Sequence, residues 1–153
     1  MKALLLAGGY GKRLGLKNKP KCMVKVAGKP VLEHLVEYLK KAGITEIIIK
    51  VHHKPEKIMD YFGTRVLYYY ETKLLDPEQS EKLLSDWLGD IYVVMNGDTL
   101  TNINLTKMIN FAMNVDFKKE RYGGTKIVNK LTKEYYSWSG DGAYYFDCGT
   151  PQK

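Results

Sequence analysis

The chain has 153 residues of ordinary globular composition and a formal net charge of +7. This length suits one domain with one core, so we expect a single domain over residues 1–153. No apolar run approaches the length of a membrane span, and the run from Ala3 to Ala7 is too short for a signal peptide. We therefore expect a cytoplasmic protein without a membrane partner.

The chain begins with a short apolar run, Lys2 to Ala7, which ends in glycines and predicts a buried strand. The basic residues around these glycines are Lys2, Lys12, Arg13, Lys17, Lys19, Lys21, Lys25 and Lys29, with no acid before Val31. Such a cluster favours a polyanionic ligand such as phosphate over a merely solvated surface. No nucleic-acid-binding motif is visible, so we expect no nucleic-acid partner.

The next elements alternate between helix and strand patterns. Pro30 to Ala42 carries apolar residues at helical spacing, with proline at its start and Gly43 just past its end. The other elements predicted up to residue 70 are short strands at Met23–Val26, Ile47–Val51 and Arg65–Tyr70 and a helix at Pro55–Phe62.

A second long helix is predicted from Asp76 to Leu88. Asp76 can cap it, and Gln79 can complete a capping box. Its predicted apolar face is Leu83, Leu84, Trp87 and Leu88. The remaining predictions are a strand at Ile91–Met95, a helix at Leu105–Ala112, and strands at Lys126–Val128 and Ala143–Phe146.

This alternation predicts an α/β fold, a Rossmann-like three-layer domain with a mostly parallel central sheet and helices on both faces. In such sheets ligands bind beyond the carboxyl ends of the strands. The loop after the first strand and Asp98 after a later strand should therefore reach the same crevice.

Glycines directly after a strand let backbone N–H groups approach phosphates where a side chain would clash. Gly8, Gly9 and Gly11 occupy such a position, and Arg13 can bind a phosphate bidentately. The pattern matches neither a dinucleotide fingerprint nor a P-loop, because Leu14 stands where the last glycine of the fingerprint should be and Arg13 follows Gly11-Lys12. Taken alone, the cluster also fits an ordinary strand-to-loop turn.

Two acids stand at predicted strand ends. Asp98, in Asn96-Gly97-Asp98, follows the Ile91–Met95 run, and Asp147 follows the apolar run before Gly149. A carboxylate so placed can hold a divalent cation against phosphate oxygens. An isolated aspartate is more often a turn or helix-cap residue, so neither acid decides the question alone. The two cysteines, Cys22 and Cys148, fit no zinc spacing and are expected to be reduced thiols.

Five motifs follow one another in a specific order. They are Gly8-Gly9-x-Gly11-x-Arg13-Leu14, Pro20-Lys21, Gly28-Lys29-Pro30, Asn96-Gly97-Asp98-Thr99 and Asp147-x-Gly149-Thr150-Pro151. This order resembles the sugar-1-phosphate nucleotidyltransferases, which include glucose-1-phosphate thymidylyltransferases and mannose- and heptose-1-phosphate guanylyltransferases. The resemblance implies a glycosyltransferase-A-like nucleotidyltransferase fold. It also implies transfer of a nucleoside monophosphate from a nucleoside triphosphate (NTP) to a sugar 1-phosphate, releasing pyrophosphate.

The resemblance also implies a role for each matching residue. The nucleotide-binding residues would be Ala7, Gly8, Gly9, Gly11, Arg13, Lys21, Glu71, Asn96 and Gly97. Arg13, Lys21 and Asp98 would be catalytic, and Asp98 and Asp147 would coordinate Mg²⁺. The nucleophile would be a sugar phosphate oxygen that is already anionic, so no general base is required.

One departure from the family concerns the base. The family's Gly-Thr-Ala-Gly type loop, which approaches the base, is absent, and Leu74 to Gln79 takes its place. Glu71 stands near the position where the family often presents a base-contacting glutamine or glutamate. Residues 113–146 are compressed relative to the family's sugar-binding region. The sequence therefore identifies neither the base nor the sugar.

Two alternatives stay open at this stage. A nucleotidyltransferase of the same fold could use a non-sugar phosphate acceptor, as molybdopterin and cobinamide guanylyltransferases do. The chain could also be a non-catalytic nucleotide-binding module. The sequence leaves the oligomeric state open, a homo-oligomer included.

Overall fold

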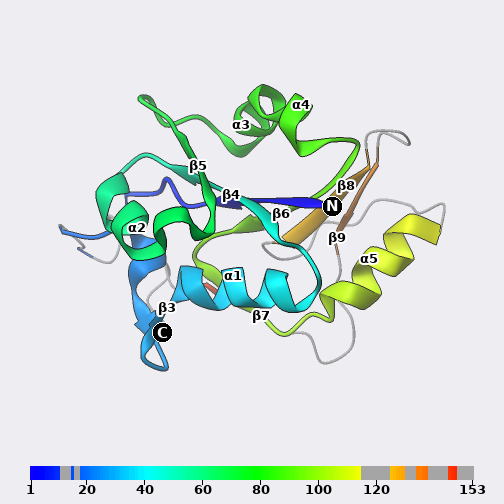
Figure 1. Cartoon of the computed structure of the whole chain (residues 1–153), viewed down its shortest axis with the longest axis horizontal. Coiled ribbons are helices and arrows are strands. Elements are labelled where there is room, and N and C mark those ends of the chain that lie inside the picture. Colours follow the sequence, from blue (N-terminus) through cyan, green and yellow to red (C-terminus); the bar gives the residue numbers. More distant parts are fainter. Residues whose placement is uncertain (11–14, 16–17, 115–124, 130–133, 138–144, 148–153) are drawn as a thin grey trace.

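A computed structural model of the chain describes residues 1–10, 15, 18–114, 125–129, 134–137 and 145–147. Its centre is a six-stranded sheet in the order β5-β4-β1-β6-β8-β9 (Figure 1). The strands are β1 (Lys2–Leu6), β4 (Glu46–Val51), β5 (Leu67–Tyr70), β6 (Ile91–Asn96), β8 (Thr125–Asn129) and β9 (Glu134–Ser137). The first four strands of this order are parallel, whereas β8 pairs antiparallel with both β6 and β9. The predicted mostly parallel α/β sheet is confirmed.

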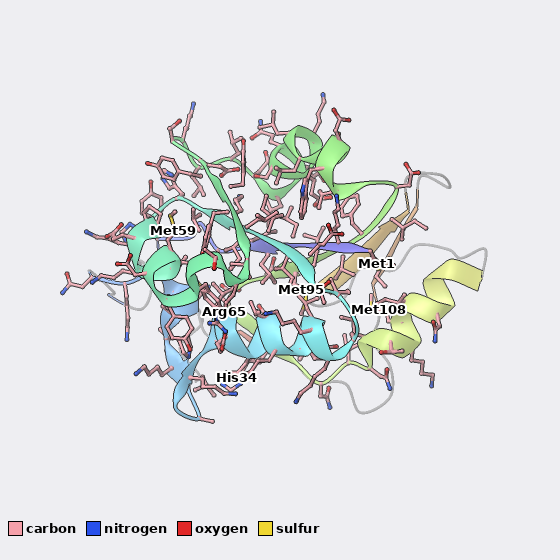
Figure 2. All side chains as sticks on the ribbon, in the orientation of Figure 1. Met1, His34, Met59, Arg65, Met95 and Met108 are labelled. Atoms are coloured by element: carbon pink, nitrogen blue, oxygen red, sulfur yellow. The ribbon has the colours of Figure 1, made fainter. Side chains whose placement is uncertain are left out.

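Helices cover both faces of the sheet (Figure 1). On one face lie α1 (Val31–Lys41), α2 (Pro55–Phe62) and α5 (Leu105–Asn114); on the other lie α3 (Pro77–Leu83) and α4 (Ser85–Leu88). Successive side chains of a strand point to opposite faces. In β1, Leu5 accordingly packs into the core shared with α1 and α5, and Leu4 packs with Leu84 and Leu88. Figure 2 shows Met95 and Met108 in the larger of these two cores.

Two small antiparallel pairs flank the main sheet. A short 3-10 helix, η2 (Lys21–Met23), leads into the hairpin of β2 (Lys25–Val26) and β3 (Lys29–Pro30), so the strand predicted from Met23 begins later. The hairpin turns through Ala27 and Gly28, whose φ angles are +50° and +80°. The other pair joins β7 (Thr99–Thr101) to β10 (Tyr145–Asp147). A second 3-10 helix, η3 (Gly63–Arg65), takes the first residue of the predicted Arg65–Tyr70 strand.

The helix predicted from Asp76 to Leu88 is broken. The capping box is confirmed: Gln79 N donates to Asp76 Oδ1 at 2.9 Å, and Asp76 N donates to Gln79 Oε1 at 3.3 Å. The chain leaves helical geometry at Leu84, where α3 ends and α4 follows. The break buries Leu84 and Leu88 against the sheet and leaves Leu83 62% exposed. The predicted apolar face was therefore right for Leu84 and Leu88 and wrong for Leu83.

Cys22 is a free, buried cysteine, and Cys148 lies outside the described residues. Within the described ranges, no helix combines the length and the apolar character needed to cross a lipid bilayer.

Candidate active site

Three chain segments meet at the carboxyl ends of the parallel strands β4, β1 and β6. Ala7 N donates to Lys50 O at 3.0 Å, and Gly97 N donates to Leu6 O at 2.9 Å. The chain that leaves β1 is therefore fixed between the chains that leave its two neighbours. Ligands of open α/β sheets bind at this edge.

The glycine loop, residues 8–10, starts at this point. Gly8 is buried, and a Cβ at this position would lie 3.0 Å from Leu74 Cδ1. Gly9 is exposed, and a Cβ added there would meet nothing within 4 Å, so its backbone is open to a ligand. Gly11 and Arg13 lie outside the described residues, and their roles stay predictions.

Lys21 and Asp98 are brought together although they are far apart in sequence. Lys21 Nζ forms an ion pair with Asp98 Oδ2, and the two side chains are 22% and 23% exposed. The other carboxylate oxygen, Oδ1, accepts a hydrogen bond from Thr99 Oγ1 at 3.0 Å. A cation and an anion of the predicted site thus lie side by side and remain partly open to solvent.

Gly97 allows this arrangement by its lack of a side chain. A Cβ at Gly97 would lie 2.9 Å from Leu6 O and 3.2 Å from Ala7 Cβ. The turn after β6 therefore packs directly on the backbone that leaves β1, and it places Asp98 beside the glycine loop's starting point. Asn96, also predicted to bind nucleotide, ends β6 and is exposed.

The pairing of β7 with β10 bears on the predicted metal site. Asp98 offers a carboxylate, and the ladder between β7 and β10 pairs Asp147 with Thr99, the neighbour of Asp98. The backbone thus brings the second predicted ligand to the same place, and carboxylate oxygens are ligands that Mg²⁺ prefers. The side chain of Asp147 is outside the described part. Among side chains that are described, no cluster of three or more His, Cys, Asp or Glu forms a metal site.

Glu71 was predicted to bind nucleotide, near the position where the family often contacts the base, and that role stays a prediction. Its side chain is 1% exposed, and Oε2 lies 3.4 Å from Lys50 Nζ, which is also buried. Lys50, His52 and Ser80 surround Glu71 and were not predicted as site residues. The sequence did contain a signal for this group, namely a lysine, Lys50, inside the apolar run of β4. A buried charge needs a partner of opposite charge, so this lysine indicated a polar cluster nearby.

Cys22 lies next to Lys21 in η2 and is almost fully buried. Burial, and secondarily the negative charge of Asp98, raises the pKa of its thiol to about 12. The thiol therefore stays protonated at neutral pH and contributes to packing beneath the Lys21–Asp98 pair rather than acting as a nucleophile.

Comparison with known proteins decides the family. The model of the MobA-like NTP transferase domain matches residues 3–80, which include the glycine loop, Lys21 and Glu71. The chain belongs to this family. The predicted resemblance to nucleotidyltransferases is thereby confirmed.

The relatives within and around this family agree with that assignment. A D-glycero-alpha-D-manno-heptose 1-phosphate guanylyltransferase of Campylobacter jejuni is 38% identical over 115 residues, covering 71% of this chain and 52% of the relative. The enzyme of the same name from Aneurinibacillus thermoaerophilus is 34% identical over 128 residues, covering 78% of this chain and 55% of the relative. The chain therefore spans about half the length of these curated relatives.

A solved structure supports the fold of this family member. HddC of Yersinia pseudotuberculosis, solved in complex with GMP-PN, superposes with a TM-score of 0.72 at 24% identity. The match covers 98% of this chain and 94% of the other. At this identity the match carries the fold alone.

Proposed function

We propose that the chain transfers a nucleoside monophosphate from an NTP to a sugar 1-phosphate, with Mg²⁺, and releases pyrophosphate. The observation that carries this proposal is the meeting of the glycine loop with the Lys21–Asp98 pair at one edge of the sheet. Membership of the MobA-like NTP transferase family supports it. We also propose a cytoplasmic location and no nucleic-acid partner.

The residues suit an in-line displacement that needs no general base. A sugar phosphate oxygen attacks the α-phosphorus and forms a new P–O bond. The bond from the α-phosphorus to the oxygen that bridges it to the β-phosphorus breaks, and pyrophosphate leaves with the electron pair of that bond. The work of the protein is positioning and charge neutralisation. The exposed backbone at Gly9 can approach phosphate oxygens, and Lys21 can exchange Asp98 for a phosphate. Removing one such electrostatic contact costs about 2.7–4 kcal/mol, roughly a 10²–10³-fold loss in rate.

Asp98 and Asp147 would hold the magnesium ion. When bound, Mg²⁺ draws negative charge from the phosphate oxygens and favours departure of pyrophosphate. The Asp98 side chain is 23% exposed, so an incoming ion can reach its carboxylate and compete with Lys21 for it.

The names of the relatives guide the choice of substrates. Two are heptose 1-phosphate guanylyltransferases, and one from Oryza sativa is a probable mannose-1-phosphate guanylyltransferase. We therefore place GTP first among nucleotides, and heptose and mannose 1-phosphates first among acceptors.

The test is pyrophosphate release with Mg²⁺ across the four NTPs and glucose, mannose, N-acetylglucosamine and heptose 1-phosphates, with molybdopterin and cobinamide phosphate as non-sugar acceptors. Turnover with one pair, lost in Asp98→Asn and Lys21→Met but kept in Lys57→Met, a control at an exposed lysine of α2, would support the proposal. Nucleotide binding without turnover would contradict it and favour the non-catalytic alternative. Turnover only with a pterin or cobinamide phosphate would replace the acceptor and keep the reaction. Binding to DNA or RNA that weakens steeply with salt would overturn the expectation of no nucleic-acid partner.

A further inference from the structure

A charged pair lies buried beneath the site described above. Lys50 in β4 and Glu71 after β5 have side chains that are 4% and 1% exposed, with Nζ and Oε2 3.4 Å apart. A buried ion pair is weak evidence for stability, because removing two charges from water offsets much of their attraction. The pair is therefore best understood through what it holds in place.

The first group of contacts fixes the segment from residue 71 to residue 80, called here the 71–80 segment. Lys50 Nζ donates to Leu75 O at 3.0 Å and to Ser80 Oγ at 3.1 Å. Glu71 accepts from Leu75 N at 3.1 Å through Oε2 and from Ser80 Oγ through Oε1. The ion pair thus closes the loop between β5 and α3 upon itself and ties it to the sheet.

The second contact runs from Glu71 to the glycine loop. His52 Nδ1 and Glu71 O are 2.6 Å apart, and a carbonyl can only accept, so Nδ1 carries the hydrogen. In the neutral imidazole Nε2 is then an acceptor, and Tyr10 Oη donates to it at 2.6 Å. The Tyr10 ring also meets the His52 ring edge-on, with centroids 5.3 Å apart.

The two groups of contacts meet at Gly8, where an added Cβ would lie within 3.5 Å of Leu74, His52 and Lys50. Leu74, in the 71–80 segment, lies so close to Gly8 that a Cβ there would be 3.0 Å from Leu74 Cδ1. Glu71 therefore holds the 71–80 segment through its carboxylate and the glycine loop through its carbonyl and His52. These are the two chain segments that border the start of the nucleotide site.

We propose that Glu71 is a positioning residue, which sets the spacing between the glycine loop and the 71–80 segment so that a nucleoside binds between them. It acts through Lys50, Ser80 and the His52–Tyr10 link and does not itself touch the base. This inference rests on the proposed function for the identity of the ligand.

The test compares three variants that each weaken the network at a different side chain, namely Glu71→Gln, Ser80→Ala and Tyr10→Phe. The controls are Glu37→Gln, which breaks the exposed pair with Lys29, and Tyr70→Phe on an exposed ring. The dissociation constants of GTP and of inorganic pyrophosphate are measured by calorimetry with Mg²⁺ and without acceptor. Loss of even one hydrogen bond corresponds to about three- to tenfold in affinity, so GTP binding should weaken at least that much in each variant. Pyrophosphate binding should weaken less than GTP binding, because it lacks the nucleoside that lies between the two segments, and the controls should match the wild type.

Two outcomes would overturn the positioning role. If Glu71 touched the base, Glu71→Gln would change the preference among the four nucleotides, while Tyr10→Phe would leave GTP affinity intact. Equal loss of GTP and pyrophosphate binding would indicate general destabilisation.

Hydrogen exchange supplies a readout that needs no nucleotide. Ser80→Ala should speed exchange at residues 72–76 and also at residues 8–10, and a change confined to residues 72–76 would refute the coupling. A chain with normal coupling that releases no pyrophosphate would refute the proposed function alone.

Discussion

Gly97→Ala is the sharpest test of how the site is built. The added Cβ would lie 2.9 Å from Leu6 O, about half an ångström inside ordinary van der Waals contact, and 3.2 Å from Ala7 Cβ. Both obstacles belong to the backbone or to an atom rigidly attached to it, so neither can rotate away. The turn must move, which strains the 2.9 Å hydrogen bond from Gly97 N to Leu6 O. Overpacking and the weakened hydrogen bond together predict a loss of about 2–4 kcal/mol in the free energy of unfolding.

Differential scanning calorimetry measures this loss, with Gly9→Ala as the matched control. For a chain of this size the loss corresponds to a fall of about 5–15 °C in Tm. A Cβ at Gly9 meets nothing within 4 Å, so Gly9→Ala should melt near the wild type. A Gly97→Ala protein whose Tm stays within about 2 °C of the wild type would show that the turn relaxes freely. The inference that Gly97 fixes Asp98 would then be wrong.

Three further predictions concern stability. In urea titrations, Leu83→Gln should change the free energy of unfolding by less than about 0.5 kcal/mol, whereas Leu84→Ala should lower it by about 2–5 kcal/mol. Similar losses in the two variants would contradict the break between α3 and α4. Ala27→Asn should raise Tm by roughly 2–4 °C, because asparagine tolerates the positive φ that this hairpin turn requires, and a fall would argue against that turn. The Cys22 thiol titrates near 9.0 when unfolded and at about 12 when folded, so its contribution to stability is complete below pH 9 and is lost as pH rises toward 12. Between pH 8 and pH 10 the wild-type Tm should therefore fall more steeply than that of Cys22→Ala, and parallel curves would refute the raised pKa.

The elements that the sequence predicts best are those with strong local signals. Proline and glycine bracket α1, and the structure begins and ends that helix within one residue of the prediction. The break at Leu84 carries no such signal, because leucine is a good helix former and only the fit of two leucines to the sheet decides it. The short strand β7 was also missed, since its partner β10 lies more than forty residues away along the chain.

The candidate site, like the fold, was predicted only in part. The ordered motifs led to Lys21 and Asp98, and the fold places them in contact. The position of Glu71 was also singled out, but the direction of its carboxylate depends on Lys50 and Ser80, which only the folded chain brings near. Long-range polar networks of this kind leave little trace in local patterns.

The ion pair between Lys21 and Asp98 has a consequence for the order and strength of binding. Lys21 and Asp98 each satisfy the charge of the other. A triphosphate that recruits Lys21 leaves Asp98 unsatisfied, and a divalent cation that recruits Asp98 leaves Lys21 unsatisfied. Binding of the nucleotide should therefore increase the affinity for the cation. By thermodynamic linkage, binding of the cation increases the affinity for the nucleotide by the same factor. The protein should therefore hold nucleotide alone or magnesium alone weakly, and hold the two together far more tightly than the separate affinities suggest.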